Sequence, residues 1–374
     1  MTFPGDYEWK IDITAQATKV SSNETSFPYY FNLANITSAN FWDNVQTDGG
    51  DLRVSTDSAG TTQVPLEVVA INDTAETGEI HFKDSTDSAS NKTFYLWWSD
   101  STGTVSQPGV ATTYGRNAVW SVHETVYHLQ ESSGTVIDSA GNNNGTNSGA
   151  TTEVTGQIEN GYDLDGINDE IILGGIQLNS ADNWTIEAWI EEDSGSDAGA
   201  IFSQRNAFTT MDFYLIHYQS SHTNHANKWE LYLGESLGDG FTGTTFGSDN
   251  ITNTKTKVTL NKSGNDYILY VNGSAKGTFT SSQGWSTSDT LKAGSMQSGF
   301  YFDGTYDEIT ITLSSLSSGW ESTKYNMQSS NSTFWVEGTP EEITPSTFTI
   351  TTNAATSITT TEATLNGTVT DFGG

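Results

Sequence analysis

The chain has 374 residues, of which 46 are acidic and 14 basic, giving a formal net charge of −32, and it contains no cysteine. The missing cysteines exclude disulfides, cysteine zinc sites and thiolate nucleophiles, and the negative charge disfavours nucleic acids and anionic membrane surfaces as partners. The surplus of carboxylates either keeps the protein dispersed in solution or supplies oxygen ligands for Ca²⁺.

Alternating polar and apolar residues indicate six strands in the first block of the chain, separated by Gly, Asp, Asn and Ser turns. This pattern is typical of an all-β sandwich or barrel. A first β-sandwich domain is therefore expected over residues 1–105, followed by a linker rich in Gly, Ser, Thr and Pro at 106–115. The expected strands are 8–16, 27–36, 51–57, 63–71, 78–84 and 92–100.

The second block, residues 116–338, begins with a segment that contains SVHETVYHLQES at 121–132. A zinc protease needs His-Glu-x-x-His, which places two imidazoles one helical turn apart, whereas His123 and His128 are five residues apart. The β-branched and aromatic neighbours predict a strand over 118–129. Odd spacing on a strand sends the two rings to opposite faces, so no single ion is expected to bind both.

The rest of this block contains many further strand patterns, enough for a two-sheet jelly roll. Asn272-Gly273 separates two of them and predicts a tight hairpin, because both residues tolerate positive φ. Only residues 314–329 show helical spacing, after a serine-rich N-cap candidate. A linker is expected at 339–346, and the tail 347–374 contains two strand patterns but is too short to fold as a sandwich.

The order of these segments makes the second block similar to a known family. It resembles a laminin-G-like, concanavalin-A-like jelly roll, in which His128 is implied to pack or form hydrogen bonds rather than bind a ligand. The first block resembles a β-rich domain of unknown function common in microbial and viral surface proteins, and the tail resembles the start of a fibronectin-III-like module. The jelly-roll resemblance rests on residues 126–150, 161–174, 184–190 and 304–311, with 316–338 similar to the helix and closing strand of such domains.

Jelly rolls of this kind include glucanases, which carry Glu-x-Asp-x-x-Glu on one strand so that the carboxylates enter one cleft. The segment EAWIEED has Glu187 and Glu191, but Trp189 stands in the position of the aspartate. The adjacent Asp307 and Glu308 are expected on opposite faces of a strand, and no Gly-x-Ser-x-Gly elbow stands out. We therefore expect no enzyme, with a glycoside hydrolase as the remote alternative.

Two sets of candidate binding residues remain. The segment DLDGINDE and one later aspartate offer oxygen ligands for Ca²⁺, although a polar hairpin turn explains the same residues. Glycan recognition needs exposed aromatic faces beside planar polar groups, which the loops of this block supply. The Ca²⁺ candidates are Asp163, Asp165, Asn168, Asp169 and Asp307, and the glycan candidates are Trp229, Trp285, Tyr218, His222 and His225, with Phe241 as a further loop aromatic.

The expected fold is all-β, with tandem β-sandwich domains of which the central one is a concanavalin-A-like jelly roll. The expected function is a non-catalytic adhesion protein of tail-fibre or surface-fibre type, which binds glycans or glycoproteins on a cell surface, with Ca²⁺ as candidate cofactor. The alternative is a structural fibre or capsid decoration protein whose β modules act as spacers and self-associate as a homo-oligomer or larger assembly.

We expect an extracellular location, on a virion or cell surface. No apolar run is long enough to span a bilayer, so no membrane insertion is expected. The first residues lack the basic and apolar segments of a secretory signal peptide. Release by lysis, removal of a leader or another export route would each explain a surface protein with such a beginning.

Overall fold

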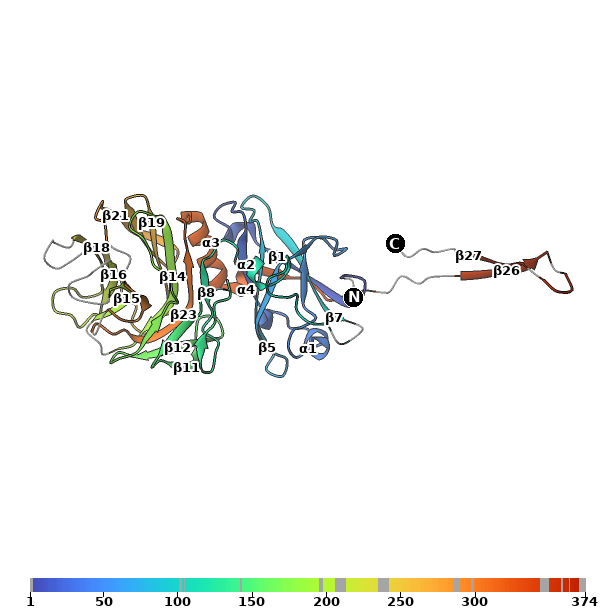
Figure 1. The fold of residues 1–374 in the computed structure, drawn as a ribbon, viewed down its shortest axis with the longest axis horizontal. Coiled ribbons are helices and arrows are strands. Elements are labelled where there is room, and N and C mark those ends of the chain that lie inside the picture. Colours follow the sequence, from blue (N-terminus) through green and yellow to red (C-terminus); the bar gives the residue numbers. More distant parts are fainter. Residues whose placement is uncertain are drawn as a thin grey trace.

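The computed structural model describes residues 3–100, 103, 105–141, 143–194, 198–205, 213–234, 242–285, 289–296, 299–343, 350–357, 359–362 and 364–369. Over these residues the chain forms two β-sandwich domains side by side and a separate hairpin (Figure 1). The expected fold class, all-β with tandem sandwiches, is confirmed. Within the described residues, no helix is long and apolar enough to cross a membrane.

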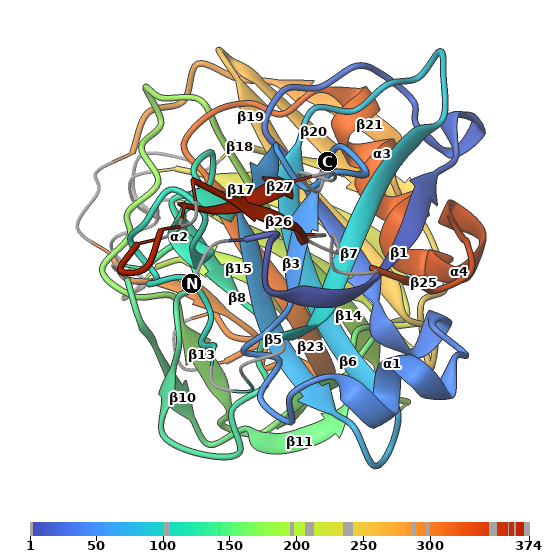
Figure 2. The same cartoon turned by 90° about the vertical axis from the view of Figure 1, so that its right-hand side faces the viewer.

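The first domain packs two sheets face to face, and Figure 2 looks onto it along the long axis of the molecule. One sheet has the order β24-β1-β7-β3-β4, with β25 also paired to β1, and the other has the order β2-β6-β5. In β6, Ile80 and Phe82 join the core, so Glu79 and His81 point away from it. The elements are β1 (Tyr7–Ala15), β2 (Phe27–Asn32), α1 (Ala39–Asn44), β3 (Arg53–Ser55), β4 (Gln63–Val64), β5 (Leu66–Asn72), β6 (Thr77–Asp84) and β7 (Lys92–Asp100), with 3-10 turns at Ala17–Lys19 and Leu33–Asn35.

The second domain consists of two eight-stranded sheets that enclose a single large core. The outer sheet has the order β18-β17-β16-β15-β22-β13-β10-β9, and the inner sheet, nearer the first domain, has the order β11-β12-β23-β14-β19-β20-β21 with β8 paired to β23. Strands of the outer sheet are β9 (Thr135–Val136), β10 (Gly145–Ser148), β13 (Glu170–Ile172), β15 (Ala198–Gln204), β16 (Phe213–Tyr218), β17 (Lys228–Leu233), β18 (Thr242–Ser248) and β22 (Leu291–Ala293). Strands of the inner sheet are β8 (Thr125–Tyr127), β11 (Thr151–Thr155), β12 (Asn160–Asp165), β14 (Trp184–Glu192), β19 (Thr256–Ser263), β20 (Asp266–Val271), β21 (Ser274–Thr280) and β23 (Asp303–Thr312).

After β23 the chain returns to the first domain through α3 (Ser318–Ser329), α4 (Asn331–Phe334), β24 (Trp335–Glu337) and β25 (Glu341–Glu342). Helix α3 lies between the domains (Figure 1). Its residues Trp320 and Met327 belong to the core of the first domain, and so does Trp335 of β24. Strand β24 pairs antiparallel with β1, with Trp335 opposite Ala15. The two domains are therefore interlocked rather than joined end to end.

This arrangement corrects two expectations about the end of the second block. Residues 335–337 do not close the jelly roll, because they pair with β1 in the first domain. The expected linker at 339–346 contains β25, which also pairs with β1. A short edge strand pairs with whichever sheet edge is open to it. Its own residues therefore do not predict its partner.

Three local predictions can be compared with the structure. The expected helix is confirmed as α3, and Ser317 caps it by accepting a hydrogen bond from the Trp320 backbone N–H at 2.9 Å. The Asn272-Gly273 hairpin is confirmed, with φ of 51° and 69°. The strand expected over 118–129 is wrong for most of its length, because α2 (Arg116–Val119) covers its first two residues, turns follow, and only β8 is a strand.

The tail forms β26 (Ile350–Thr356) and β27 (Thr364–Val369), which pair with each other. Among the described residues neither strand has another partner in a sheet. Two strands were expected here, and they are confirmed. The resemblance of the tail to a fibronectin-III-like module stays a prediction.

Candidate functional site

Strands β16 and β17 carry aromatic side chains on the face of the outer sheet that is turned away from the core. Phe213 and Leu215 are buried in the core, so Tyr214 between them points outward. Tyr214 is paired with Tyr232 of β17, and their rings stack with centroids 4.8 Å apart and an interplanar angle of 21°. The guanidinium carbon of Arg205 lies 5.7 Å from the centroid of Tyr214. On this side of the sheet the two tyrosine rings therefore face each other, and the buried guanidinium of Arg205 lies beside Tyr214.

Glu230 of β17 lies next to the aromatic pair. Its carboxylate accepts hydrogen bonds from the Tyr232 hydroxyl at 2.5 Å and the Thr245 hydroxyl at 3.2 Å, and it contacts Nδ1 of His225 at 2.6 Å. Burial alone would raise the pKa of Glu230, but these hydrogen bonds outweigh burial and lower the pKa below its usual value. The carboxylate is therefore ionised at neutral pH, and these partners hold it in a fixed orientation with 4% of the residue exposed.

Three of the five expected glycan-binding residues gather around this carboxylate. The ring of Tyr218 lies 4.7 Å from that of His222 and 4.8 Å from that of His225, measured between centroids. Of these three residues His225 lines a hollow of about 430 Å³, together with Glu230, Tyr232 and residues 243–245. We call this region the aromatic face; it comprises Arg205, Tyr214, Tyr218, His222, His225, Glu230 and Tyr232.

The predictions that Trp229 and Trp285 bind glycans are wrong, because both indole rings are buried. Trp229 is 0% exposed and donates its indole N–H to Asp249 at 2.9 Å. Trp285 is 5% exposed and donates to the backbone carbonyl of Leu178 at 3.0 Å. Each ring fills the core while its N–H reaches a polar partner at the rim, which is how buried tryptophan is usually accommodated. Phe241 lies outside the described residues.

Four of the five expected Ca²⁺ ligands lie near one another at the end of β12. Asp165 accepts hydrogen bonds from the backbone N–H groups of Ile167 and Asn168, and Asp169 accepts one from Asp165, so these side chains form the turn. Burial and the nearby Asp193 and Asp303 raise the pKa of Asp163. The prediction that Asp307 belongs to this group is wrong. Asp307 lies beside the first domain, where it accepts a hydrogen bond from the backbone N–H of Ile158 at 2.7 Å. The Ca²⁺ site stays a prediction.

Asp307 and Glu308 depart from the strand alternation that the sequence predicts. Tyr306 and Ile309 both point into the core, so the two residues between them turn to the opposite side. Glu308 has a positive φ of 53°, and the pairing of β14 with β23 shifts register at this point. This is a β-bulge, and the prediction that the two carboxylates lie on opposite faces is therefore wrong.

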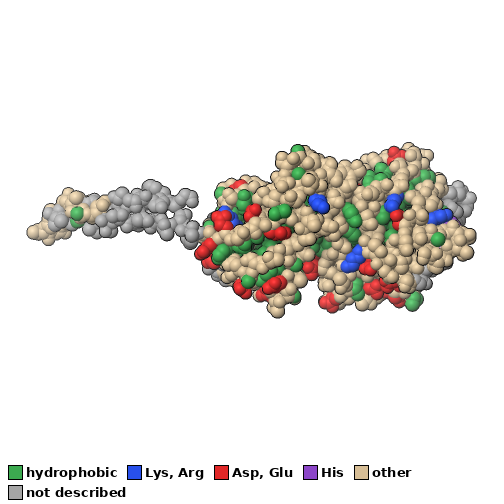
Figure 3. Space-filling view, turned by 180° about the vertical axis from the view of Figure 1, so that it is seen from behind, with side chains coloured by type: hydrophobic (Ala, Val, Ile, Leu, Met, Phe, Trp, Pro, Cys, Tyr) green, Lys and Arg blue, Asp and Glu red, His purple; other side chains and the backbone are tan. Residues whose placement is uncertain are grey.

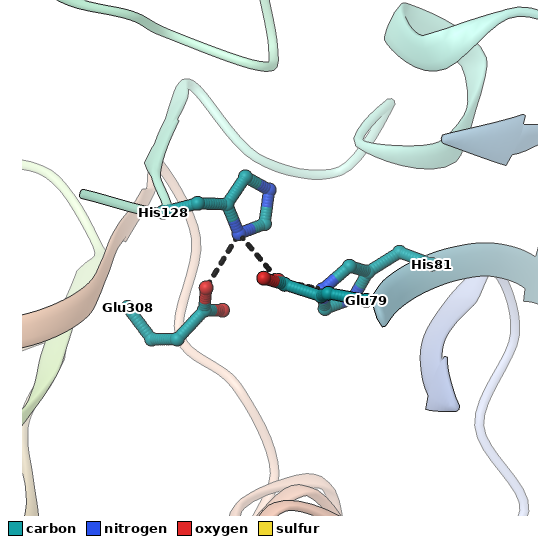
Figure 4. Close-up of side chains that lie close together, drawn as sticks. All are labelled: Glu79, His81, His128 and Glu308. Atoms are coloured by element: carbon teal, nitrogen blue, oxygen red, sulfur yellow. Dashed lines mark hydrogen bonds and ion pairs between the residues drawn. The ribbon is translucent and has the colours of Figure 1, made fainter. Parts of the chain in front are cut away.

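The bulge aims Glu308 at the first domain, where a cluster of ionisable side chains is buried between the domains (Figure 4). Nδ1 of His128 lies 2.5 Å from Glu308 Oε1 and 3.2 Å from Glu79 Oε1, and Nε2 of His81 lies 2.7 Å from the same Glu79 oxygen. One potential ligand atom from each residue lies within 4.8 Å of all the others. We call Glu79, His81, His128 and Glu308 the inter-domain cluster. In the part of the chain that the structure describes, no other three His, Asp or Glu side chains converge so closely.

Glu67 of β5 adds a third carboxylate beside this cluster, 3.4 Å from Nε2 of His128. Its own oxygens accept hydrogen bonds from Ser139 at 2.6 Å and from the indole of Trp120. Burial opposes charge on His128, but the surrounding carboxylates, first Glu308, outweigh burial and raise its pKa. The implied hydrogen-bonding role of His128 is confirmed by these contacts. Glu67 and His128 also line a pocket of about 410 Å³ between the domains.

Glu187, which belongs to the segment where the glucanase pattern is incomplete, is sealed under α3. It forms ion pairs with Lys257 at 2.8 Å and with Lys324 of α3, and all three side chains are at most 2% exposed. Thr310 donates to the same carboxylate at 2.6 Å. A carboxylate that is covered by a helix and paired with two lysines cannot reach a substrate, so Glu187 has a structural role.

Glu321 of α3 borders the Glu187 network, and we predict that Glu321→Gln stabilises the protein in alkali. Burial, followed by repulsion from Glu187, raises the pKa of Glu321 from 4.5 to about 8. The folded protein thus holds a proton that the unfolded chain releases, so stability falls as pH rises from 4.5 to about 8. Chemical unfolding should show the variant more stable than wild type at about pH 9 and little changed at about pH 5. Equal stability at the higher pH would contradict this account.

Residues 165–320 match the family model of the concanavalin A-like lectin/glucanases superfamily. This confirms the expected resemblance for most of the second domain, which we therefore call the concanavalin A-like domain. The resemblances of the first domain and the tail stay predictions. A comparison with curated proteins finds no match.

Solved structures similar to the chain include the binding domain of botulinum neurotoxin serotype D, at 14% identity and a TM-score of 0.44, covering 55% of this chain and 52% of that one. The ligand-binding domain of the same serotype in complex with N-acetylneuraminic acid matches at 13% identity and a TM-score of 0.44, covering 55% of this chain and 51% of that one. Domain 4 of AbnA, an extracellular arabinanase from Geobacillus stearothermophilus, was solved in complex with arabinotriose. It matches at 16% identity and a TM-score of 0.43, covering 55% of this chain and 98% of that one. The match thus spans about half of the toxin structures' length.

Proposed function

We propose that the protein is a non-catalytic carbohydrate-recognition protein, which binds glycans on the aromatic face of its concanavalin A-like domain. The observation that carries this proposal is the stacked Tyr214–Tyr232 pair beside the oriented carboxylate of Glu230. Sugars present apolar C–H faces and many hydroxyl groups, so they suit aromatic rings with hydrogen-bonding groups beside them. His225 and Thr245 add further polar groups to the lining of the same hollow.

The same geometry favours binding over hydrolysis. Glycoside hydrolysis usually needs two carboxyl groups, one of which is protonated to act as a general acid. The described lining of the hollow contains one carboxylate, Glu230, and its hydrogen bonds keep it ionised. An ionised carboxylate accepts hydrogen bonds from sugar hydroxyls but cannot protonate a leaving group.

We further propose that the chain acts on the exterior of a virion or cell as part of a tail fibre or surface fibre. Two interlocked β domains followed by a β hairpin give an elongated chain of modules (Figure 1). Acidic side chains with few basic ones among them lie on the surface shown in Figure 3, in keeping with the net charge of −32. This charge keeps such a protein soluble and disfavours anionic polymers as ligands.

A glycan array with and without Ca²⁺ tests the binding proposal. We expect wild type to bind a limited set of oligosaccharides. Tyr232→Ala, which removes one ring of the stack, should weaken binding about tenfold or more, equivalent to about 1.4 kcal/mol. Tyr114→Ala is the matched control, because Tyr114 is an exposed tyrosine between the domains, and it should leave affinity unchanged.

Two outcomes would count against the proposal. Silence of wild type across the array, together with self-association in light scattering, would favour the structural-fibre alternative, in which the two-stranded β26–β27 sheet joins a sheet of another chain by strand addition. Release of reducing sugar from a bound glycan would revive the glycoside hydrolase alternative. Dependence of binding on Ca²⁺ would support the predicted calcium site. Binding that is equal with and without Ca²⁺ would show that glycan recognition does not need this ion.

A further inference from the structure

We propose that the inter-domain cluster binds one divalent transition-metal ion, with Zn²⁺ as the best fit, and that this ion joins the two domains. Glu79 and His81 come from β6 of the first domain, while His128 follows β8 and Glu308 belongs to β23 of the second. Each offers one ligand atom, and the four atoms lie within 4.8 Å of one another. The proposal is independent of carbohydrate binding, because the cluster and the aromatic face share no residue.

The donor set fits a transition metal better than calcium. Two imidazole nitrogens and two carboxylate oxygens form a mixed set that suits Zn²⁺ and its first-row neighbours, and Zn²⁺ takes four such ligands in its structural sites. Ca²⁺ takes six to eight oxygen ligands, as a rule without imidazole. The inter-domain cluster therefore differs in chemistry from the calcium site predicted at the Asp163–Asp169 turn.

Buried charge gives an independent argument. Glu79 is 0% and Glu308 1% exposed, and the second oxygen of each, Oε2, is buried without a hydrogen-bond partner. Unpaired buried carboxylate oxygens are costly. Glu67, at most 5% exposed, adds another negative group 3.4 Å from His128. A divalent cation would neutralise this surplus of negative charge, and the unpartnered oxygens could coordinate it.

The surroundings of the cluster also suit a metal site. Ligand histidines commonly place their second nitrogen against a carboxylate that orients the ring, and Glu67 stands in that relation to Nε2 of His128. Ser139 and Trp120 in turn hold Glu67 in place. The pocket between the domains reaches Glu67 and His128 from outside, which provides a path for the ion.

The test uses the full chain, stripped with a chelator and then desalted after incubation with Zn²⁺, Co²⁺ or Ca²⁺. We expect about one Zn²⁺ per chain by mass spectrometry of the metal, a higher melting temperature with Zn²⁺ than without, and visible absorption typical of four-coordinate Co²⁺. Glu79→Gln and Glu308→Gln, which keep side-chain volume, should lose these three signals. Ca²⁺ should produce none of them at this site.

Glu192→Gln is the matched control, because Glu192 is also a buried carboxylate and lies 3.0 Å from the ring of His217. It should retain the metal. Failure of wild type to keep Zn²⁺ or to gain thermal stability with it would overturn the proposal, whatever the variants do. Retention of Zn²⁺ by Glu308→Gln, or equal loss in Glu192→Gln, would overturn it as well.

Discussion

Trp335→Ala is expected to destabilise the protein by about 3–5 kcal/mol, the usual cost of removing a large aromatic side chain from a core. Trp335 is 1% exposed, and its ring contacts those of Tyr29, Phe31 and Phe82. Its indole N–H also donates to the backbone carbonyl of Tyr30 at 2.9 Å. The loss should fall on the first domain, although Trp335 follows the second domain in the sequence.

Hydrogen exchange followed by mass spectrometry localises this effect. Peptides that cover β2 and β6 should exchange faster in Trp335→Ala, because β24 and its tryptophan complete the core against which these strands pack. The control is Val336→Ala, since Val336 is the next residue and is 52% exposed; its effect should stay within about 0.5 kcal/mol. Faster exchange confined to the second domain would contradict the interlocked arrangement.

Glu187→Gln is expected to cost about 3 kcal/mol at neutral pH, because it leaves Lys257 and Lys324 buried without their main partner. Burial favours the neutral form of Glu187, but the two lysines outweigh burial and hold its pKa well below 4.5. The charged network therefore stabilises the fold above about pH 4.5, and this contribution is lost as pH falls toward the depressed pKa. The difference between wild type and variant should shrink over the same acidic range.

A double-mutant cycle makes the prediction sharper. In wild type Glu321→Gln should stabilise the protein in alkali, as argued above. In the Glu187→Gln background Glu321 is the remaining carboxylate of the network that opposes Lys257 and Lys324, so Glu321→Gln should there be destabilising. Glu191→Gln, on the same strand and half-buried, is the control and should change little. Additive effects of the two substitutions would show that the network does not act as a unit.

Local patterns in the sequence predicted local structure well. The Asn272-Gly273 turn and the helix capped by Ser317 depend on residues close together in the chain, so their chemistry was visible there. The partner of β24 was not visible, because Trp335 finds its place among aromatic residues of the distant N-terminal domain. The bulge at Glu308 was equally hidden, since it arises from a register shift against β14.

The candidate site was predicted in part, for a similar reason. Tyr218, His222 and His225 were expected in loops, and the structure brings their rings together, with Tyr218 at the end of β16. Trp229 was misplaced, although alternation within KWELYL puts it on the same side as Leu231 and turns Tyr232 outward. Strand pairing then brings Tyr232 beside Tyr214, a contact that alternation alone does not reveal.

The inter-domain cluster shows the limit of sequence analysis most clearly. The segment GEIHFKD places Glu79 and His81 on one face of a strand, and this signal was available. Nothing in that segment indicates that His128 and Glu308 of another domain lie opposite. Only the packing of the two sandwiches brings these four side chains together.

The crystal structure of the full chain with an oligosaccharide that it binds would test the central claim most directly. We expect a sugar ring against the Tyr214–Tyr232 pair, with at least one sugar hydroxyl group hydrogen-bonded to the Glu230 carboxylate. A sugar bound instead in the pocket between the domains, or on the first domain, would show that the aromatic face is not the recognition site.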